Sequence, residues 1–496
     1  EFSEPSTAPL NVNAVMKDIK NQFRHSKHGQ IKNELKKIDN AKLISNLLEK
    51  RNLAAHLDIS GKKREFDKTI KIPSDKSCSI RALIFGSQAM GISNIKNLLE
   101  SWDVLNCIKA LRTLGIKIVK SNSNNTHKVY GNGLGSFRTG SKVKKIFVGN
   151  SGTTARILCG LLAVYPSRFY LYGDQSMNKR DMSRIIGPLE KVGAFFYPKG
   201  KKTLPITIEG TAMPLAQNHT EHLGSAQVKS SLLASFLNCR GISILQENRP
   251  SRDHTEILLK KIGADIKIKK LKKGNLISLR GQKNLFAFNY EVGSDPSSAA
   301  FLIVLTLLTP GAKSTIPGVI CNATRIKYIQ ILKKMNANIK IKNLRRDSNS
   351  GELLGSIVTS SSILKPITVS KDIGTVIDEL PILFVVASLT KGISKFKSIS
   401  ELAHKESSRA IEMKKILIQA GIKCKNTKDS MTIYGKNKIK AAKKFILVKT
   451  KGDHRICMSS VILSLVTGIR TKINNFETVN TSFPGFISLI KKNLGA

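Results

Sequence analysis

The sequence predicts an α/β protein built from six similar units, grouped three and three into two domains. Two observations lead to this prediction. Six apolar, helix-like runs each open on a small or charged residue, and an amphipathic helix that ends in glycine or asparagine recurs between them. Successive copies are spaced by roughly 70–85 residues, which is too long for a solenoid repeat. Because these helical runs alternate with short strand-like runs, each unit is expected to be a small βαβ-containing module.

The first kind of run begins at residues that suit the start of a helix. Asp and Ser side chains accept hydrogen bonds from first-turn amides, and the helix start presents a partial positive charge to an anion. If the six starts converge, one cleft would hold a ligand with several negative charges. An ordinary capped helix with solvated basic residues is the alternative for each start taken alone. The starts are Ser74-Asp75-Lys76, Asn150-Ser151-Gly152, Ser225-Ala226-Gln227, Asp295-Pro296-Ser297, Asp378-Glu379 and Asp453-His454-Arg455.

The second kind of run is an amphipathic helix followed by a strand. Its last helical turn is followed by a residue that tolerates the left-handed C′ position, which is glycine or, less often, asparagine. These residues are Gly115, Gly193, Gly263, Asn336 and Gly421. Residues 1–62 lack both signatures. They begin with a polar, proline-containing stretch, and apolar positions at a helical period follow from about residue 31 to 57. We expect residues 1–62 to be a basic N-terminal extension, flexible or partly helical.

The net charge is +48, from 82 lysines and arginines against 34 acidic residues. A charge of this size raises nucleic acid as a partner. The lysines are spread from end to end, however, and aromatic residues make up only 6%. We therefore expect no nucleic-acid partner. A basic protein that recruits RNA or another polyanion is the alternative from a different functional class.

Cysteine usage and hydropathy bear on the compartment. No cysteines have CxxC or Cys/His spacing, so we expect buried reduced thiols, no metal and a reducing environment. The longest apolar runs fall well short of the ~20 residues that span a bilayer. The first residues contain no apolar signal core. The sequence therefore predicts a soluble cytoplasmic protein with no membrane partner. The cysteines are Cys78, Cys107, Cys159, Cys239, Cys321, Cys424 and Cys457.

Nine short motifs follow one another in order from about residue 68 to the C-terminus. Together they resemble the 5-enolpyruvylshikimate-3-phosphate (EPSP) synthases, and the later ones favour the class II branch of that family. Any one match is weak, whereas nine collinear matches are strong. The motifs are Ile72-Pro-Ser-Asp-Lys76-Ser77-Cys-Ser-Ile-Arg81, Gly149-Asn-Ser-Gly152-Thr-Thr-Ala-Arg156, Ser225-Ala-Gln227-Val-Lys229-Ser, Arg252-Asp-His254-Thr-Glu, Asp295-Pro-Ser-Ser-Ala-Ala, Ile377-Asp378-Glu379, Lys405-Glu406-Ser-Ser-Arg409, Asp453-His-Arg455 and Ser482-Phe-Pro484.

This resemblance implies a fold and a reaction. The fold would be a two-domain inverse α/β prism of six βαβαββ units, with residues 74–291 as one domain and residues 63–73 plus 292–496 as the other. The first strand would cross into the second domain. The reaction would transfer the enolpyruvyl group of phosphoenolpyruvate to the 5-hydroxyl of 3-phosphoshikimate, in a monomer without metal or organic cofactor. The alternative among enzymes is the sister enolpyruvyl transferase that acts on a UDP-amino sugar. Lys76-Ser77 followed by Arg81 does not match the Lys-Asn opening expected of that enzyme.

The resemblance also implies roles for individual residues. The catalytic residues would be Asp378, Glu406 and Lys76. Asp378 would orient and deprotonate the 5-hydroxyl, Glu406 would deliver a proton to C3 of phosphoenolpyruvate, and Lys76 would bridge both substrates. The residues expected to contact 3-phosphoshikimate are Lys76, Ser77, Arg81, Ser225, Ala226, Gln227, Arg252, Asp378 and Lys405. The residues expected to contact phosphoenolpyruvate are Lys76, Gly152, Arg180, Gln227, Arg409 and Arg455.

Simpler roles exist for the same residues. Asp378 would serve only as a helix cap, Glu406 and Arg409 as a surface ion pair, and Arg455 as one more solvated cation. Arg156 is expected to be structural, and His254 and His454 to pack or orient neighbours. The sequence departs from the family pattern at four positions. Asp181 stands where the family usually has proline, Ser408 where it has aspartate, and Ile80 where it has histidine or asparagine. Thr481 stands where one branch of the family has lysine. Asp181 would weaken phosphoenolpyruvate binding if it paired with Arg180, and Ser408 would lose a supporting contact.

Overall fold

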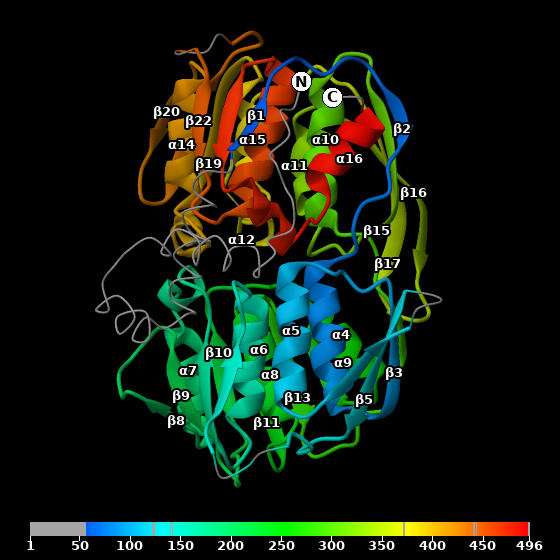
Figure 1. Ribbon diagram of the computed structural model, residues 1–496, viewed down its shortest axis with the longest axis vertical. Helices are drawn as coiled ribbons and strands as arrows, with labels where there is room; N and C mark the ends of the chain where they lie inside the picture. The colour runs from blue at the N-terminus through cyan, green and yellow to red at the C-terminus, as the bar shows by residue number, and fades with distance from the viewer. Residues whose placement is uncertain are drawn as a thin grey trace, which may run out of the picture.

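The structure, a computed structural model, has two lobes that meet at their ends (Figure 1). It describes residues 56–494 except 122–124, 139, 141, 371–372, 440–441 and 443. The helix expected between residues 31 and 57 lies almost wholly outside these residues. Within the described ranges, each lobe has its own hydrophobic core, one formed mainly by residues 78–292 and the other by residues 57–70 and 299–490. The predicted α/β class is confirmed.

The first lobe, the first domain, contains three four-stranded sheets with the orders β14-β3-β5-β4, β6-β7-β9-β8 and β10-β11-β13-β12. In each sheet one strand pair is parallel and the others are antiparallel. Each unit thus combines one parallel crossover with a hairpin. The strands are β3 (Met90–Lys96), β4 (Lys117–Lys120), β5 (Thr126–Asn132), β6 (Lys144–Phe147), β7 (Arg168–Tyr172), β8 (Phe195–Tyr197), β9 (Ile206–Glu209), β10 (Asn218–Glu221), β11 (Ile242–Glu247), β12 (Asp265–Lys270), β13 (Asn275–Arg280) and β14 (Asn289–Glu291).

Two kinds of helix accompany these sheets. The helices α4, α6 and α8 are buried almost all round, which fits their continuous apolar sequences, whereas α5, α7 and α9 each have an exposed face. Gly160 allows α6 to approach α8 closely, because a Cβ there would lie 2.0 Å from the carbonyl oxygen of Ser231. The helices are α4 (Lys76–Gln88), α5 (Trp102–Thr113), α6 (Gly152–Leu162), η1 (Met177–Lys179), α7 (Ser183–Val192), α8 (Ala226–Phe236) and α9 (His254–Lys261).

The second domain repeats this plan, with sheet orders β16-β17-β15-β2, β18-β19-β21-β20 and β1-β23-β22. Its buried helices are α10, α13 and α15. The strands are β1 (His56–Ile59), β2 (Asp67–Thr69), β15 (Lys313–Ile320), β16 (Asn338–Arg346), β17 (Leu353–Ser360), β18 (Thr368–Val369), β19 (Gly392–Lys397), β20 (Lys423–Asn426), β21 (Ser430–Gly435), β22 (Ile446–Lys449) and β23 (Thr471–Asn474). The helices are α10 (Pro296–Leu308), α11 (Lys327–Lys334), α12 (Ile373–Val376), α13 (Leu380–Ser388), η2 (Ser400–His404), α14 (Arg409–Gln419), α15 (His454–Thr467), η3 (Phe476–Thr481) and α16 (Phe486–Leu494).

The chain crosses between the domains twice. The strand β2 pairs in parallel with β15 of the second domain, after which the chain descends into α4 of the first (Figure 1). The strand β14, which ends the first-domain segment, pairs in parallel with β3. The expected crossing of the first strand into the second domain is therefore present, and two chain segments connect the lobes.

The end of the predicted N-terminal extension needs a correction. Residues 56–59 were expected to lie in a flexible or helical extension, yet they form β1, which pairs antiparallel with β23. Leu57 and Ile59 are fully buried in the second core. The alternation of apolar and polar residues in His56–Ile59 is the two-residue period of a half-buried strand. These residues belong to the second domain.

The helix ends follow the sequence prediction. All six predicted starts lie at the beginning of a buried helix, and Asp75, Ser151, Ser225, Asp295 and Asp453 each accept a first-turn amide. The five predicted C′ residues all have positive φ, Asn336 included. All seven cysteines are buried free thiols. Among the described residues, no helix is both long and apolar enough to cross a membrane.

Candidate active site

The buried helices of both domains direct their N-termini toward the interface between the lobes, where the predicted site residues gather. In the first domain, Asp75 caps α4 by accepting from Cys78 N at 2.7 Å. Lys76 follows the cap, and its Nζ lies 2.8 Å from Asp103 Oδ2. Burial raises the pKa of Asp103 against the lowering effect of Lys76. Asp103 thus fixes the Lys76 ammonium in place while leaving it partly exposed to a ligand.

Arg81 is held more tightly than a free ligand-binding arginine. Its Nε donates to Thr255 Oγ1 at 2.8 Å and its Nη2 to Ser230 Oγ at 2.9 Å. Its Nη1 donates to the carbonyl of Ser77 at 3.2 Å. Because a guanidinium has five N–H donors, two remain for a substrate. The hydroxyl partners bring no negative charge, so the positive charge of Arg81 is not neutralised by them.

Two arginines lie beside the start of α6. A Cβ on Gly152 would fall 2.8 Å from Arg156 Nη1 and 3.1 Å from Arg180 Nη1, so glycine leaves room for them. Arg156 donates to Gln227 Oε1 and to the carbonyl of Asp181. Burial and the charge of Arg180 lower the pKa of Arg156 to about 10. Arg156, which the sequence analysis assigned to structure, therefore lies among the predicted phosphoenolpyruvate residues.

The carboxylate of Asp181 does not pair with Arg180. Its carboxylate accepts from Ser183 N at 2.9 Å and from Ser183 Oγ at 2.8 Å, at the start of α7. The Asp181 side chain is exposed, and the guanidinium of Arg180 instead donates to Asn150 Oδ1. Asp181 therefore replaces the usual proline as a helix-start residue, and it does not occupy the arginine that phosphoenolpyruvate would need.

The start of α8 presents a polar surface to the same space. Ser225 caps the helix by accepting from Val228 N at 3.3 Å. Gln227 Nε2 donates to Thr153 Oγ1 at 3.1 Å, while its Oε1 accepts from Arg156. Ser225, Ala226 and Gln227 are all partly exposed. The predicted first-domain residues of α4, α6 and α8 thus lie together.

Asp378, from the second domain, is surrounded by cations of both domains. Arg252 Nη2 of the first domain lies 2.9 Å from Asp378 Oδ2. Lys405 Nζ and Arg409 Nη1 lie 3.3 and 3.2 Å from Asp378 Oδ1. Burial would raise the pKa of Asp378, but the charge of Lys405 and those of nearby arginines outweigh it and hold that pKa well below its usual range. Asp378 does not act as the side-chain cap of α13.

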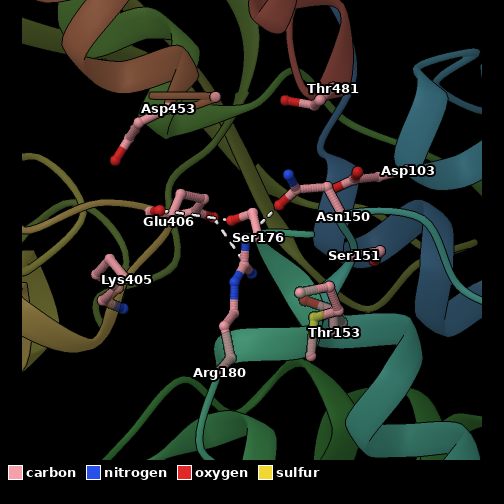
Figure 2. Close-up of polar contacts among 12 residues, drawn as sticks. Asp103, Asn150, Ser151, Thr153, Ser176, Arg180, Lys405, Glu406, Asp453 and Thr481 are labelled. Carbon is pink, nitrogen blue, oxygen red and sulfur yellow. Dashed lines mark hydrogen bonds and ion pairs between the residues drawn. The ribbon is translucent and has the colours of Figure 1, made fainter. Parts of the chain in front are cut away.

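Glu406 is the second carboxylate of the cleft. It pairs with Arg409 Nη2. Arg180 Nη1 lies 3.6 Å from Glu406 Oε1 and comes from the first domain (Figure 2). Burial opposes ionisation of Glu406, but Arg409 and Arg180 hold its pKa well below its ordinary value. Ser176 also donates to the Glu406 carbonyl across the interface, at 3.4 Å. Glu406 is therefore ionised while arginines are its partners.

Arg409 is a buried cation held by three carboxylates of the second domain, Asp378, Glu406 and Asp453. It is buried, and its Nε donates to Asp453 Oδ2 at 2.8 Å. Asp453 also caps α15 and accepts from Ser407 Oγ at 2.9 Å. This network holds Arg409 in place although Ser408 has no side-chain capping bond on α14. Glu406 and Arg409 are therefore parts of one buried network, and the surface ion-pair alternative is wrong.

Arg455 and His454 complete the second-domain side. Arg455 Nη1 donates to the carbonyl of Asp378 at 2.9 Å and lies 3.6 Å from Glu379 Oε1. His454 Nδ1 lies 3.2 Å from Thr481 Oγ1. Burial, together with the charge of Lys76, holds the pKa of His454 well below its usual value. Arg455 is therefore a partly buried, oriented cation rather than a solvated one.

The assembled site is a cluster of arginines and lysines around two carboxylates of the second domain, Asp378 and Glu406, which share Arg409 as a partner. Its cations outnumber its carboxylates, so it suits ligands that carry phosphates and carboxylates. Asp103, Asn150 and Arg156 were not among the predicted site residues. Arg156 ends the second motif and follows Gly152 by four residues on one helix face, and both signals pointed to it. The partners of Asp103 and Asn150 are distant in sequence.

Structural comparison places the fold among the enolpyruvyl transferases. The enolpyruvyl transferase NikO from Streptomyces tendae matches 89% of this chain and 97% of its own, with a TM-score of 0.69 at 12% identity. EPSP synthase from Acinetobacter baumannii matches 88% of this chain and 98% of its own, with a TM-score of 0.75 at 34% identity.

The sequence comparisons are more specific. Residues 61–490 match the family model for EPSP synthase (3-phosphoshikimate 1-carboxyvinyltransferase). The 3-phosphoshikimate 1-carboxyvinyltransferase of Acidiphilium cryptum is 37% identical over 85% of this chain and 93% of its own length. The enzyme of the same name from Oceanobacillus iheyensis is 37% identical over 85% of this chain and 95% of its own. The chain belongs to the EPSP synthase family.

Proposed function

We propose that the protein is a 3-phosphoshikimate 1-carboxyvinyltransferase, which converts phosphoenolpyruvate and 3-phosphoshikimate into 5-enolpyruvylshikimate 3-phosphate and phosphate. One observation supports this most strongly. Asp378 and Glu406 of the second domain lie within ion-pair distance of Arg252 and Arg180 of the first. The two carboxylates that we propose as base and acid thus lie at the cation-lined interface between the domains, in a chain whose family supports this reaction.

Substrate binding would use the cations of both domains. The helix starts of α4 and α8, with Lys76, Arg81 and Ser225, would hold 3-phosphoshikimate from the first domain. Arg180 from the first domain and Arg409 from the second would hold phosphoenolpyruvate between them, since guanidinium groups bind phosphate and carboxylate in bidentate fashion. Phosphoenolpyruvate would need groups from both domains. Binding of phosphoenolpyruvate would therefore be coupled to closure of the two domains.

The proposed chemistry uses the two carboxylates in opposite roles. Asp378 would accept the proton of the 5-hydroxyl while the hydroxyl oxygen attacks C2 of phosphoenolpyruvate. Glu406 would donate a proton to C3. In the second step the carboxylate of Glu406 would take a proton back from C3 as the C2–O bond to phosphate breaks, and the phosphate would leave with the proton that Asp378 accepted from the 5-hydroxyl. Glu406 is ionised while Arg180 and Arg409 are its partners. A substrate phosphate that takes over these arginines would raise the pKa of Glu406 and allow it to carry the proton.

Phosphate release from the purified protein tests the proposal. Release is expected only when phosphoenolpyruvate and 3-phosphoshikimate are both present. Omitting 3-phosphoshikimate, or replacing it with UDP-N-acetylglucosamine, should abolish release. A protein that released no phosphate with either acceptor, or that preferred the UDP-sugar, would contradict the proposed activity.

Replacing Gly152 with alanine is expected to raise the KM for phosphoenolpyruvate roughly 10-fold, as a single methyl group typically does in a tight pocket. The added Cβ would press on Arg156 Nη1 at 2.8 Å and on Arg180 Nη1 at 3.1 Å. We expect the unmodified protein to be inhibited by glyphosate in competition with phosphoenolpyruvate, and the alanine variant to resist it. Steady-state phosphate release at varied phosphoenolpyruvate and glyphosate measures both effects.

Gly187→Ala is the matched control for this substitution. Gly187 is also helical, in α7, and a Cβ there would meet nothing within 4 Å. Its KM and glyphosate response should equal those of the wild type. Equal inhibition of the Gly152→Ala variant and the wild type would show that Gly152 does not border the phosphoenolpyruvate site.

A further inference from the structure

The two chain segments that connect the domains are hydrogen-bonded to each other. Asp75 N donates to the carbonyl of Gly293 at 2.8 Å, and Asp295 N donates to the carbonyl of Pro73 at 3.0 Å. An antiparallel bridge lies between these two bonds. Directly after it, each segment enters a buried helix, α4 in the first domain and α10 in the second. We call this pair of segments, residues 73–75 and 293–295, the hinge.

A single buried cation, Arg325, contacts the last residue of each hinge segment, Asp75 and Asp295. Arg325 Nη1 is 2.7 Å from Asp75 Oδ2, and Nη2 donates to Asp295 Oδ1 at 2.9 Å. The Arg325 side chain is 3% exposed. It comes from the turn between β15 and α11 of the second domain. One side chain of one domain therefore contacts the N-cap residues of a helix in each domain.

The contact extends to α9 of the first domain. Arg325 Nη1 lies 3.2 Å from His254 Nε2, and His254 Nδ1 lies 2.6 Å from Glu352 Oε1. Because a guanidinium only donates, Nε2 is the acceptor and Nδ1 carries the proton that Glu352 accepts. Cys78, His254 and Glu352 offer ligand atoms within 4.8 Å of one another. Both ring nitrogens are hydrogen-bonded, however, so this group belongs to the hinge contacts rather than to a metal site.

Arg325 is the cation that both hinge carboxylates share. Burial and the charge of Asp75 raise the pKa of Asp295 to about 6, whereas the charge of Arg325 outweighs burial and lowers the pKa of Asp75. Two carboxylates buried close together are strongly unfavourable without a shared counter-ion. Arg325 supplies that charge in a planar fork that reaches both, which lysine does not match.

A chain of polar contacts links Arg325 to the cleft. Arg325 Nη2 lies 3.2 Å from Ser297 Oγ, which donates to Glu379 Oε1. Arg455 Nη1 lies 3.6 Å from the same Glu379 oxygen and donates to the carbonyl of Asp378. On the other side, Asp75 caps the helix that begins with Lys76. The groups at the two ends of this chain are those that the proposed function places on the substrates.

We propose that Arg325 is a positioning residue of the enzyme. By clamping the N-caps of α4 and α10, it fixes the geometry with which the two domains close, so that Arg252 and Arg180 of one domain meet Asp378 and Glu406 of the other. Arg325 is outside hydrogen-bond reach of the groups assigned to substrate, so its effect is transmitted through the hinge. This inference rests on the proposed function for its kinetic readout, whereas its closure readout is independent of catalysis.

Arg325→Met tests the inference, with Arg325→Lys as the conservative variant. Arg325→Met is expected to lower kcat about 10- to 100-fold and to raise the KM for phosphoenolpyruvate, since small displacements of catalytic groups cost this much. The Kd for 3-phosphoshikimate alone should change little, because most of its proposed contacts lie on the first domain. The lysine variant should recover part of kcat. Small-angle X-ray scattering should show that 3-phosphoshikimate plus glyphosate compacts the wild type more than Arg325→Met.

Arg470→Met is the matched control. Arg470 also forms an arginine–carboxylate pair, with Nη2 2.6 Å from Asp58 Oδ2, but it lies at the exposed surface, directly before β23, and its partner is on the edge strand β1. Its kcat and its ligand-induced compaction should equal those of the wild type. If Arg325→Met does not fold, Asp295→Asn provides the test, because asparagine still caps α10 while one of the two charges on Arg325 is removed.

Two outcomes would overturn the inference. In the first, Arg325→Met shows the same kcat and the same ligand-induced compaction as the control Arg470→Met. Asp295→Asn would be compared in the same way if Arg325→Met does not fold. In the second, Arg325→Met weakens the binding of 3-phosphoshikimate by the same factor by which it lowers kcat. Such a result indicates a general loss of structure. Failure of the proposed function is distinguishable from both, because the wild type itself would then release no phosphate.

Discussion

Replacing Asp378 with asparagine is expected to lower kcat by about 10³-fold, which is the typical contribution of a positioned general base. The KM for 3-phosphoshikimate should stay constant or fall. Asp378 contributes a negative charge among Arg252, Lys405 and Arg409. Its removal frees these cations for an anionic substrate, so binding is retained while proton abstraction is lost. Phosphate release with each substrate varied separately measures both constants.

The matched control for this prediction is Asp58→Asn. Asp58 is also paired with an arginine, Arg470, in the second domain, but it lies on β1 at the surface. Its kcat should be unchanged. An Asp378→Asn enzyme that turned over at the wild-type rate would leave Asp378 with only the role of a counter-ion for the neighbouring cations.

The sequence predicts the fold well wherever local chemistry decides the structure. The caps Asp75, Ser151 and Ser225 begin buried helices where their side-chain oxygens predicted them. Asn336 takes the left-handed conformation that its place after an amphipathic helix indicated. These features depend on a few neighbouring residues, so a repeat is visible without any knowledge of tertiary structure.

Features that depend on distant contacts could not be predicted in the same way. Residues 56–59 form a strand because β23, more than 400 residues later, offers an edge for pairing. Asp181 is harmless because its carboxylate turns toward Ser183, and no spacing rule distinguishes that from a bond to Arg180. Arg325 lies outside every motif, and its role at the hinge depends on contacts to residues 75 and 295.

The two domains also explain why the predicted site residues are scattered along the chain. Lys76, Arg180 and Arg252 lie on one lobe, whereas Asp378 and Glu406 lie on the other. Ion pairs of Arg180 with Glu406 and of Arg252 with Asp378 join them across the cleft. An anionic substrate that replaced the carboxylates at these arginines would contact both lobes and hold them together. Substrate binding, closure and the change of protonation at Glu406 are then parts of one event.

Replacing Glu406 with glutamine tests that coupling and is expected to lower kcat by about 10²- to 10⁴-fold. Glutamine has nearly the shape of glutamate but cannot deliver a proton to C3 of phosphoenolpyruvate. In D₂O the wild type should place deuterium at C3 of the product, and the variant should lose this exchange together with turnover. The KM for phosphoenolpyruvate should not rise, because Arg180 and Arg409 lose a competing carboxylate. Mass spectrometry of the product and steady-state kinetics measure the two effects.

Glu412→Gln is the control for this substitution. Glu412 lies on α14, is buried and pairs with Lys451 at 2.8 Å and Lys415 at 3.1 Å, neither of which is a predicted site residue. It should retain both turnover and deuterium incorporation. If the Glu406→Gln enzyme still placed deuterium at C3 at the wild-type rate, another group would have to carry the proton. The low pKa of Glu406 would then be explained by its ion pairs alone, with no part in the reaction.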